Sequence, residues 1–321
     1  MINLLFNEGR IIAFIGILAA FMLTCTLTSV LEKYLPRDMG RAFAHDGSKS
    51  AGKPRGAGII FILVFVFVSS LFSAMSAQFA IYLILVSVEM FTGFFDDAAK
   101  KPWGELKKGL LDFAVAIVVA ITYMHYNSNA ITIGFTGSII DIPPVLFGFL
   151  TVVLVWVSIN VTNCSDGVDG LSGTLTIITL MTIYVINTVT DRADSFNYLI
   201  LVFVVCILGY LWYNATPSKL LMGDAGSRAM GIFISIAVLK MGMPFLYIPV
   251  AIVLILDGGL GLIKVSFIRF LKIHILKNTT TPLHDHVRKV KGWSNTQTVF
   301  RFAIIQIVVS LATVYIVSFK L

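Results

Sequence analysis

The stretch QFAIYLILVSVEMFTGFFDDAAKK, residues 78–101, decides the fold. Most of it is an apolar run about long enough to cross hydrocarbon as a helix, at roughly 1.5 Å per residue. The run ends in two adjacent carboxylates, Asp96 and Asp97, and two lysines follow. Ionised groups are unfavourable inside a bilayer, so they belong at its edge. Adjacent carboxylates also repel unless a cation or proton lies between them. The stretch is therefore either a solvated helix end or part of a metal or phosphate site.

The composition extends the membrane interpretation to the whole chain. Of 321 residues, 57% are hydrophobic and only 13% are charged, whereas about a quarter of the residues in a soluble domain are charged. We therefore expect one all-α, polytopic membrane domain over residues 1–321, with no nucleic-acid partner. The three cysteines form neither a disulfide framework nor a metal motif.

Other apolar runs of sufficient length occur along the chain. The ten expected transmembrane helices are 11–31, 57–75, 78–95, 109–126, 144–160, 170–189, 196–213, 228–242, 244–268 and 299–319. Lys240 and Pro244 separate the eighth from the ninth. The connection 127–143 is expected to form a small hairpin.

Basic residues divide unequally between the two ends of these helices. Twenty of the 24 lysines and arginines fall in loops on one side, which are 32–56, 96–108, 160–170, 213–228 and 264–301. Loops rich in Lys and Arg remain in the cytoplasm. We therefore expect these loops to be cytoplasmic, both termini to lie outside, and the functional site to lie in the cytoplasmic loops.

The third of these loops carries a regular polar pattern. Asn160, Asn163, Asp166 and Asp169 recur at every third residue, a spacing that would line them along one side of a helix or 3₁₀ turn. Such a strip suits a sugar, a nucleobase edge or a hydrated cation. The alternative is a capped turn, with Asp166 or Asp169 as the N-cap of the sixth helix.

The loop before the eighth helix holds Asn214 and the motif Gly223-Asp224-Ala-Gly-Ser227. Asp224 could hold Mg²⁺, and the amides that follow could meet phosphate at a helix N-terminus. The same motif is also typical of an ordinary turn and cap.

Two more loops combine cations with other polar groups. The first contains Lys49 and Arg55 among glycines, a combination that can bind phosphate. The last contains His284 and His286 on either side of Asp285. No Cys or further His stands at ligand spacing, so pyrophosphate binding or proton transfer suits these histidines better than zinc.

Two acidic residues, Glu89 and Asp257, fall inside expected helices. We interpret Asp257, which precedes Gly258 and Gly259, as part of a helix bend satisfied by a neighbour. A solute or ion transporter, the alternative class, would show internal repeats and polar groups spread through its helices. Carboxylates, amides, cations and histidines at one membrane face instead favour Mg²⁺-assisted phosphoryl transfer at a lipid head group.

Taken in chain order, four motifs resemble the polyprenyl-phosphate N-acetylhexosamine-1-phosphate transferase superfamily. They are Asp96-Asp97-x-x-Lys100, the segment Asn160–Leu171, the segment Gly223–Ser227 and the histidine loop. The ending resembles the phospho-N-acetylmuramoyl-pentapeptide transferase branch more than the GlcNAc-1-phosphate branch, which is the alternative. The ending of this chain comprises Pro282-Leu-His284-x-His286, Lys291-Gly-Trp293 and Arg301-Phe302.

The resemblance covers nearly the whole chain and implies a Mg²⁺-dependent enzyme of the bacterial cytoplasmic membrane. That enzyme would transfer phospho-MurNAc-pentapeptide from UDP-MurNAc-pentapeptide to undecaprenyl phosphate, as a homodimer with ten helices. The implied metal ligands are Asp224 and Asp97, and the implied catalytic residues are Asp96, Asp97, His284 and His286. The implied substrate contacts are Lys49, Lys100, Asn160, Asn163, Asp166, Asp169 and Asn214.

The chain departs from this pattern in four places. Gly52-Lys53-Pro54-Arg55 stands where the family has Gly-Thr-Pro-Thr, so cations replace hydroxyl groups. Ser50, with Lys49 beside it, stands where the family usually has a lysine two residues before that glycine. Asp285 replaces the middle of three histidines, and we expect a histidine to be tolerated there. Leu221 replaces an aromatic residue, which argues against uracil stacking at that position.

Overall fold

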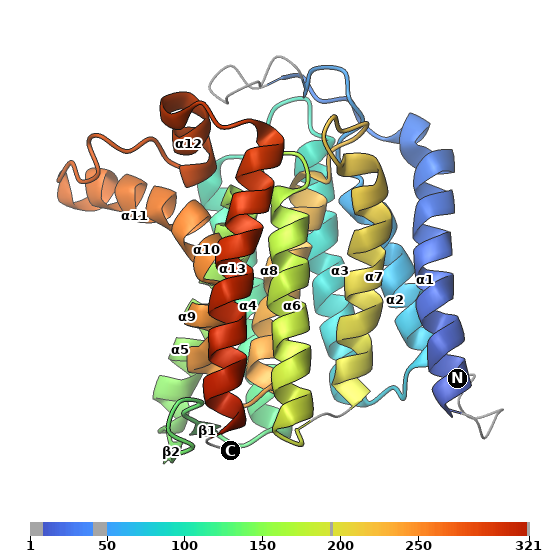
Figure 1. The fold of residues 1–321 in the computed structure, drawn as a ribbon, viewed down its shortest axis with the longest axis vertical. Coiled ribbons are helices and arrows are strands. Elements are labelled where there is room, and N and C mark those ends of the chain that lie inside the picture. The colour runs from blue at the N-terminus through green and yellow to red at the C-terminus, as the bar shows by residue number, and fades with distance from the viewer. Residues whose placement is uncertain (1–8, 41–49, 193–194, 320–321) are drawn as a thin grey trace.

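A computed structural model of the chain describes residues 9–40, 50–192 and 195–319. The fold is a helical bundle in which α1 begins and α13 ends at the same end (Figure 1). The helices are α1 (Gly9–Leu31), α2 (Gly58–Phe72), α3 (Ala77–Asp97), α4 (Glu105–Tyr126), α5 (Pro144–Cys164), α6 (Leu171–Val189), α7 (Ser195–Asn214), α8 (Gly223–Lys240), α9 (Tyr247–Val250), α10 (Ile252–Leu254), α11 (Leu260–Ser266), α12 (Leu283–Lys291) and α13 (Asn295–Ser318).

Among the described residues, seven helices are long and apolar enough to cross a membrane. The bent pair Pro244–Val250 and Ile252–Leu271 makes up to eight. The apolar helix α2 is shorter, at 15 residues. The chain is thus an all-α polytopic membrane protein, as the composition predicts. Each of the ten expected ranges contains helical residues, but ten membrane crossings stay a prediction.

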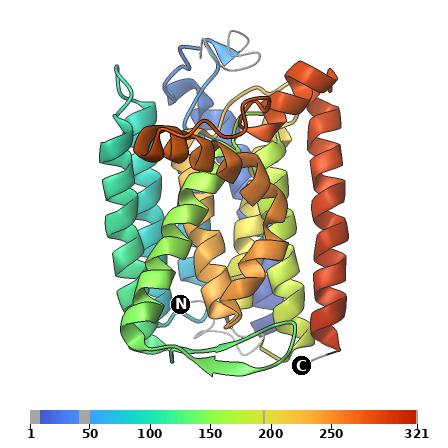
Figure 2. The same cartoon turned by 90° about the vertical axis from the view of Figure 1, so that its left-hand side faces the viewer.

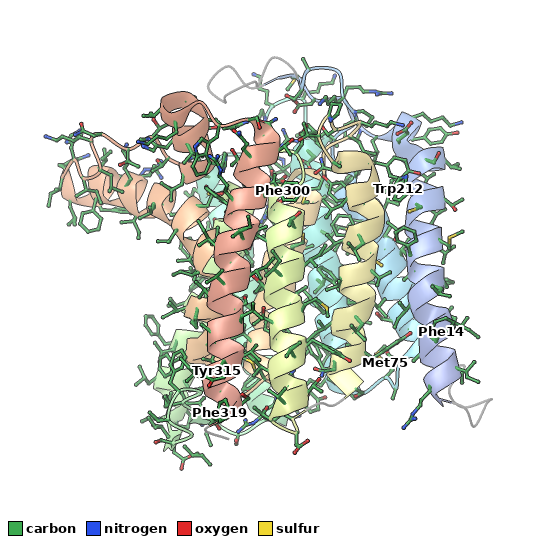
Figure 3. All side chains as sticks on the ribbon, viewed as in Figure 1. Phe14, Met75, Trp212, Phe300, Tyr315 and Phe319 are labelled. Carbon is green, nitrogen blue, oxygen red and sulfur yellow. The ribbon has the colours of Figure 1, made fainter. Side chains whose placement is uncertain are left out.

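The outer surface of the bundle is apolar, as a lipid-facing surface must be. Large side chains point away from the helices toward the surroundings (Figure 3). Trp212 is 73% exposed and Phe300 is 65% exposed. Such extensive exposure of large apolar groups would be unfavourable in water, and hydrocarbon removes the penalty.

Helix α8 lies at the centre and packs against α2, α3, α5 and α6. Nearly all of its residues are buried. A β-carbon at Gly93 of α3 would lie 2.4 Å from the carbonyl carbon of Asp224, and one at Gly58 of α2 would lie 2.0 Å from the backbone nitrogen of Gly226. Only glycine permits these approaches, so two sequence glycines bring α2 and α3 onto the start of α8.

The expected hairpin is present as β1 (Ala130–Thr132) paired antiparallel with β2 (Ile139–Asp141). The predicted boundary between the eighth and ninth helices is also confirmed, since α8 ends at Lys240 and a 3₁₀ turn begins at Pro244.

The bend in the ninth helical segment differs in position from the prediction. The two parts meet at 73° across the break at Ala251, before Asp257. Asp257 itself lies in the π-helical stretch Ile255–Gly259. Beyond it, α11 leaves the bundle axis and points sideways near the end that carries α12 (Figures 1 and 2). A β-carbon at Gly258 would lie 2.2 Å from the carbonyl oxygen of Val161, so this glycine allows close contact with α5.

Candidate functional site

The candidate site lies at the end of the bundle that carries α12, opposite the chain termini (Figure 1). There α3 ends at Asp97, α4 begins at Glu105 and α8 begins at Gly223. The first loop reaches the same place, because the backbone N–H of Leu221 donates to Pro54 and that of Ala57 donates to Leu221.

Asp97 binds the first turn of α8. Its Oδ1 accepts from the backbone N–H of Asp224 at 3.1 Å, and its Oδ2 accepts from that of Ala225 at 3.1 Å. The N-terminus of a helix favours a negative charge. Gly223 has φ of +70°, and a β-carbon there would lie 2.2 Å from Asp97 Oδ2. The glycine of the Gly-Asp-x-Gly-Ser motif is therefore required by this contact.

Arg55 connects three carboxylates. Its Nε donates to Asp97 Oδ1 at 2.7 Å, its Nη1 to Asp38 Oδ1 at 3.1 Å and its Nη2 to Asp224 Oδ1 at 3.3 Å. Burial opposes the guanidinium charge, but the charges of Asp97 and Asp224 outweigh it and raise the pKa of Arg55. Burial also opposes the charge of Asp38 and on its own would raise the pKa of this carboxyl. Hydrogen bonds from Ser50 and Arg55 outweigh burial and lower the pKa of Asp38.

Lys108, in the first turns of α4, completes the cluster. Its Nζ donates to Asp224 Oδ2 at 2.9 Å and forms an ion pair with Asp96. The other oxygen of Asp96 accepts from the backbone N–H of Trp103. Arg55 and Lys108 play a larger part than the sequence indicated. Arg55 was interpreted only as a phosphate-binding cation, and Lys108 only as part of the positive charge of its loop.

We refer to Asp38, Arg55, Asp96, Asp97, Lys108 and Asp224 as the carboxylate cluster. Among the described residues, its four carboxylates face two cations, which leaves a formal charge of −2. The cluster reaches solvent through its cations, since the side chains of Arg55 and Lys108 are 17% and 26% exposed, whereas those of Asp97 and Asp224 are 0% and 8% exposed. An excess of two negative charges matches one divalent cation.

The donor set also indicates which metal fits. No group of three or more His, Cys, Asp or Glu side chains in the described ranges is arranged to hold a metal ion. Zinc in structural sites needs four protein ligands. Mg²⁺ commonly binds through one or two carboxylates, with waters and substrate phosphates filling the other positions. Asp97 and Asp224, which share one guanidinium, fit that second pattern.

The Asn160–Asp169 strip is only partly helical. Asn160 and Asn163 lie on α5, where Asn160 donates to Asp112 at 3.2 Å and Asn163 donates to Ser227 at 2.9 Å. Helix α5 ends at Cys164, so Asp166 and Asp169 lie in the following turn. The expectation that one helix or 3₁₀ turn lines up all four residues therefore holds only as far as Asn163.

The alternative role of Asp166 or Asp169 as a helix cap is also wrong. The N-cap of α6 is Gly170, in the left-handed conformation and without a side-chain cap. Asp166 Oδ1 instead accepts from the hydroxyl of Ser172 at 2.7 Å, and Asp169 Oδ2 accepts from the backbone N–H of Ser218 at 3.1 Å.

Asn214 connects the turn before α6 with the loop before α8. Its Oδ1 accepts from Gly170 N–H and its Nδ2 donates to Leu220 O, both at 2.8 Å, and the residue is only 4% exposed. This geometry indicates a positioning residue. Lys100 is exposed and forms no ion pair with any described residue. Lys49 lies outside the described residues.

The histidine loop is held by Asp257. The backbone N–H of His284 donates to Asp257 Oδ1 at 2.7 Å, and His284 Nδ1 lies 2.9 Å from Asp257 Oδ2. Asp257 is completely buried and His284 is 3% exposed. The neighbour that the bend interpretation required is therefore a histidine. His286 Nδ1 accepts from the backbone N–H of Thr280 at 3.2 Å.

The histidine loop meets the Asn160–Leu171 turn. A β-carbon at Gly167 would lie 2.2 Å from His284 Nε2, and Arg288 Nη2 donates to the carbonyl of Gly167 at 3.4 Å. Asp166 is adjacent to Gly167, and Asn163 reaches α8 through Ser227. Asp97, Asp166, Asp224 and His284 are therefore brought to one end of the bundle.

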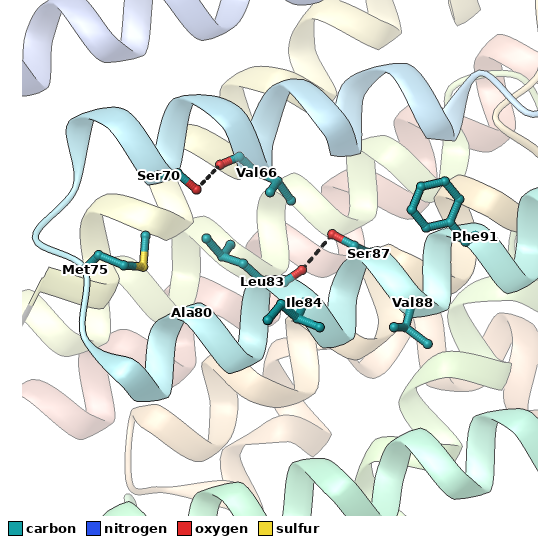
Figure 4. A pocket seen from close by; sticks show the side chains of 9 residues that line it. All are labelled: Val66, Ser70, Met75, Ala80, Leu83, Ile84, Ser87, Val88 and Phe91. Atoms are coloured by element: carbon teal, nitrogen blue, oxygen red, sulfur yellow. Dashed lines mark hydrogen bonds between the residues drawn. The ribbon is translucent and has the colours of Figure 1, made fainter. Parts of the chain in front are cut away.

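A groove of about 390 Å³ between α2 and α3 lies outside this site (Figure 4). Its two polar side chains bond within their own helices, with Ser70 donating to Val66 O and Ser87 to Leu83 O at 2.8 Å. The lining thus offers apolar contact and not phosphoryl chemistry.

The sequence is similar to known proteins along most of its length. The family model described as Glycosyl transferase family 4 matches residues 79–242. A phospho-N-acetylmuramoyl-pentapeptide-transferase of Treponema pallidum (strain Nichols) is 39% identical over 310 residues, which cover 91% of this chain and 85% of the relative. Its counterpart in Borrelia garinii subsp. bavariensis is 30% identical, covering 84% of each chain.

Proposed function

Because the chain belongs to the phospho-N-acetylmuramoyl-pentapeptide-transferase family, within glycosyl transferase family 4, we propose that it makes lipid I for peptidoglycan synthesis. In this reaction the phosphate of undecaprenyl phosphate forms a bond to the sugar-linked phosphorus of UDP-MurNAc-pentapeptide. The diphosphate bond of the donor breaks and UMP leaves. The observation that supports this proposal most directly is the carboxylate cluster, which combines a negative excess with partly exposed cations at one end of the bundle.

Asp224 and Asp97 are the proposed Mg²⁺ ligands in this chain. When bound, Mg²⁺ would neutralise the diphosphate and stabilise the charge that develops on the leaving phosphate. Lys108 and Arg55 lie beside these carboxylates and can offer charge-assisted hydrogen bonds to phosphate oxygens. Asp96 holds Lys108 and the Trp103 backbone in place, and so acts as a catalytic-site carboxylate next to the metal.

The turn between α5 and α6 is the proposed donor-binding side. Asn160 and Asn163 offer both donors and acceptors, and Asp166 and Asp169 offer acceptors for sugar or ribose hydroxyl groups. Lys100 and Lys49 would contact phosphate from the surrounding loops. Asn214 supports this side by holding the two loops together.

His284 is the proposed proton-transfer group. With Nδ1–H donating to Asp257, the Nε2 atom keeps a lone pair and faces the Gly167 turn. His286 has the opposite arrangement, because its Nδ1 accepts from Thr280 and its Nε2 then carries the proton. The two histidines can therefore accept and donate hydrogen bonds, respectively, at the edge of the site.

The finer membrane arrangement also belongs to the proposal. Counting α2, α8 and the bent pair with the seven long helices gives ten crossings, with both termini outside. The basic loops, and hence the site, then face the cytoplasm, where the nucleotide-linked donor is found. A homodimer is proposed from the family resemblance.

The decisive experiment compares donors. Purified protein with Mg²⁺ and undecaprenyl phosphate should release UMP from UDP-MurNAc-pentapeptide, and not from UDP-GlcNAc. Release from UDP-GlcNAc alone would assign the chain to the GlcNAc-1-phosphate branch. Solute uptake into liposomes without nucleotide turnover would instead support a transporter.

A further inference from the structure

Both oxygens of Asp224 are occupied by the protein's own cations. Oδ1 lies 3.3 Å from Arg55 Nη2, and Oδ2 lies 2.9 Å from Lys108 Nζ. A Mg²⁺ ion binds carboxylate oxygen at about 2.0–2.1 Å and requires near-octahedral geometry. The ion and a cationic nitrogen would then share one oxygen at short distance, where like charges repel strongly. One of the two side chains must therefore move before Asp224 can bind a metal.

The distances indicate that Arg55, and not Lys108, is the side chain that moves away from Asp224. Its contact with Asp224 is the longest of its three, at 3.3 Å against 2.7 Å to Asp97 and 3.1 Å to Asp38. Arg55 can therefore release Asp224 and keep two ion pairs. Lys108 would retain only Asp96, and its contact with Asp224 is shorter, at 2.9 Å.

The backbone keeps Arg55 close after such a movement. The Arg55 N–H donates to Pro36 O at 2.8 Å, and the neighbouring Pro54 carbonyl accepts from Leu221 N–H at 2.8 Å. The first loop is thus attached to the segment that leads into α8. Because the guanidinium is tethered beside Asp224, it competes for this carboxylate at a high effective concentration.

We propose that Arg55 is a resident counter-cation that competes with Mg²⁺ for Asp224, and so makes metal binding weaker than the carboxylates alone would allow. This inference rests on the proposed function, because it takes Asp224 as the metal ligand. In the metal-free protein, Arg55 holds three mutually repelling carboxylates together. When the metal binds, the guanidinium leaves Asp224 and keeps its contacts with Asp38 and with Oδ1 of Asp97. The metal would then use Oδ2 of Asp97, which contacts a backbone N–H and no cation of the described residues.

The test measures metal binding directly, by electron paramagnetic resonance titration of purified protein with Mn²⁺ and without substrate. Arg55→Gln should tighten Mn²⁺ binding roughly tenfold, because it removes a positive charge next to the ion. The matched control is Lys53→Gln, since Lys53 is in the same loop but donates to Ser218 at 2.9 Å. It should change the affinity by less than about twofold, because Lys53 is only half-buried and forms no ion pair with a described carboxylate of the cluster, so that its charge is largely screened.

A second readout uses stability. Without metal, Arg55→Gln should unfold at a lower temperature than the wild type, and Mg²⁺ should raise its melting temperature by more. Arg55→Lys serves if the glutamine variant does not fold, because a lysine keeps the charge but cannot bridge three carboxylates. It should tighten Mn²⁺ binding by a smaller factor.

Unchanged or weaker Mn²⁺ binding in Arg55→Gln would overturn the proposal, and so would equal tightening in Lys53→Gln. Asp224→Asn separates this failure from a failure of the metal assignment. If Asp224→Asn removes Mn²⁺ binding while Arg55→Gln leaves it unchanged, only the competition is wrong. If Asp224→Asn binds Mn²⁺ like the wild type, Asp224 is not the ligand, and both the metal assignment and the competition are wrong.

Discussion

Two charged clusters are stacked along the same three helices, and only one of them is accessible. The carboxylate cluster lies at the end of the bundle. A second cluster, which we call the inner triad, lies deeper and consists of Glu89 on α3, Asp112 on α4 and Arg228 on α8. Arg228 Nη2 lies 2.8 Å from Glu89 Oε1 and also pairs with Asp112. Both clusters contain more carboxylates than cations.

The difference between the clusters is solvent access. Arg55 and Lys108 are 17% and 26% exposed, whereas the side chains of the inner triad are at most 3% exposed. An accessible cluster can exchange a protein cation for a metal ion. A sealed one must keep its partners, because an unpaired buried charge is strongly destabilising. The comparison teaches that similar groups serve as a binding site or as a scaffold according to access.

The hydrogen bonding of the inner triad is incomplete. Neither oxygen of Glu89 accepts a hydrogen bond from a described residue, although Arg228 lies within ion-pair distance. Asn160 donates to the second oxygen of Asp112 at 3.2 Å, and so connects the triad to the end of α5, on the proposed donor-binding side. The triad places a fixed charge beneath the carboxylate cluster, since Arg228 is one helical turn from Asp224.

The largest expected effect is on the accessible cluster. Asp224→Asn should lower kcat/KM on the order of 1,000-fold, because it removes a proposed metal ligand and its charge at the reacting phosphates. Folding should be retained, since the backbone contacts of Asp224 remain. UMP release gives the rate, and size-exclusion chromatography gives the folded fraction. Asp38→Asn, which removes a carboxylate that contacts Arg55 but not Lys108, should have a smaller effect. Equal rates in Asp224→Asn and wild type would remove Asp224 from the site.

The next effect should appear in the inner triad, and in stability. Arg228→Met leaves two carboxylates buried without a cation, which should reduce stability by about 3–5 kcal/mol. The melting temperature in detergent measures the loss. The matched control combines Arg228→Met with Glu89→Gln and Asp112→Asn, and should recover much of the stability because no charge remains buried. If the single variant is as stable as the wild type, the triad is not a scaffold.

A third prediction concerns Asp257, which is as completely buried as Glu89 but is paired one to one with His284. Asp257→Asn should lower kcat by about 10–100-fold, because the imidazole loses the partner that sets its orientation and tautomer. The pH dependence of kcat should shift as well, which a purely structural role would not produce. Asp257→Glu should restore part of the rate. An unchanged pH profile would argue that Asp257 only holds the bend.

The smallest effect is expected at Asp285. Burial opposes its ionisation, but Arg288, His284 and Lys289 outweigh burial and lower its pKa, with Arg288 Nη2 at 2.6 Å. A lowered folded-state pKa contributes stability above the unfolded value of about 3.9, and this contribution is lost as the pH falls through the folded value. The melting temperature of the wild type should therefore fall as the pH drops below about 4, because this stabilising contribution is lost.

Variants of Asp285 separate this contribution from other acid effects. Asp285→Asn should be slightly less stable at pH 7 and should lack this part of the acid-dependent loss. The contacts of Asp285 also revise the expectation that a histidine is tolerated there, because Asp285→His would oppose Arg288. Equal melting temperatures of Asp285→Asn and wild type from pH 7 to pH 3 would contradict the lowered pKa.

The sequence by itself determined the all-α membrane class, the approximate positions of the long helices and the set of polar loops proposed to form the site, but not the short helix α12. These follow from local sums, namely the length of apolar runs, the distribution of lysines and arginines, and motif spacing. Glycine positions carried a further signal, since Gly93 and Gly223 mark the contact between α3 and α8.

Only the tertiary structure decided which charges face each other. Lys108 is 116 residues from Asp224 along the chain, and Asp257 is 27 residues from His284. No periodicity relates such positions. The turn after Cys164 also interrupted a regular spacing that one helix would have kept in line. Ion pairs depend on distances of a few ångströms and on burial, and both arise only when separate helices pack together.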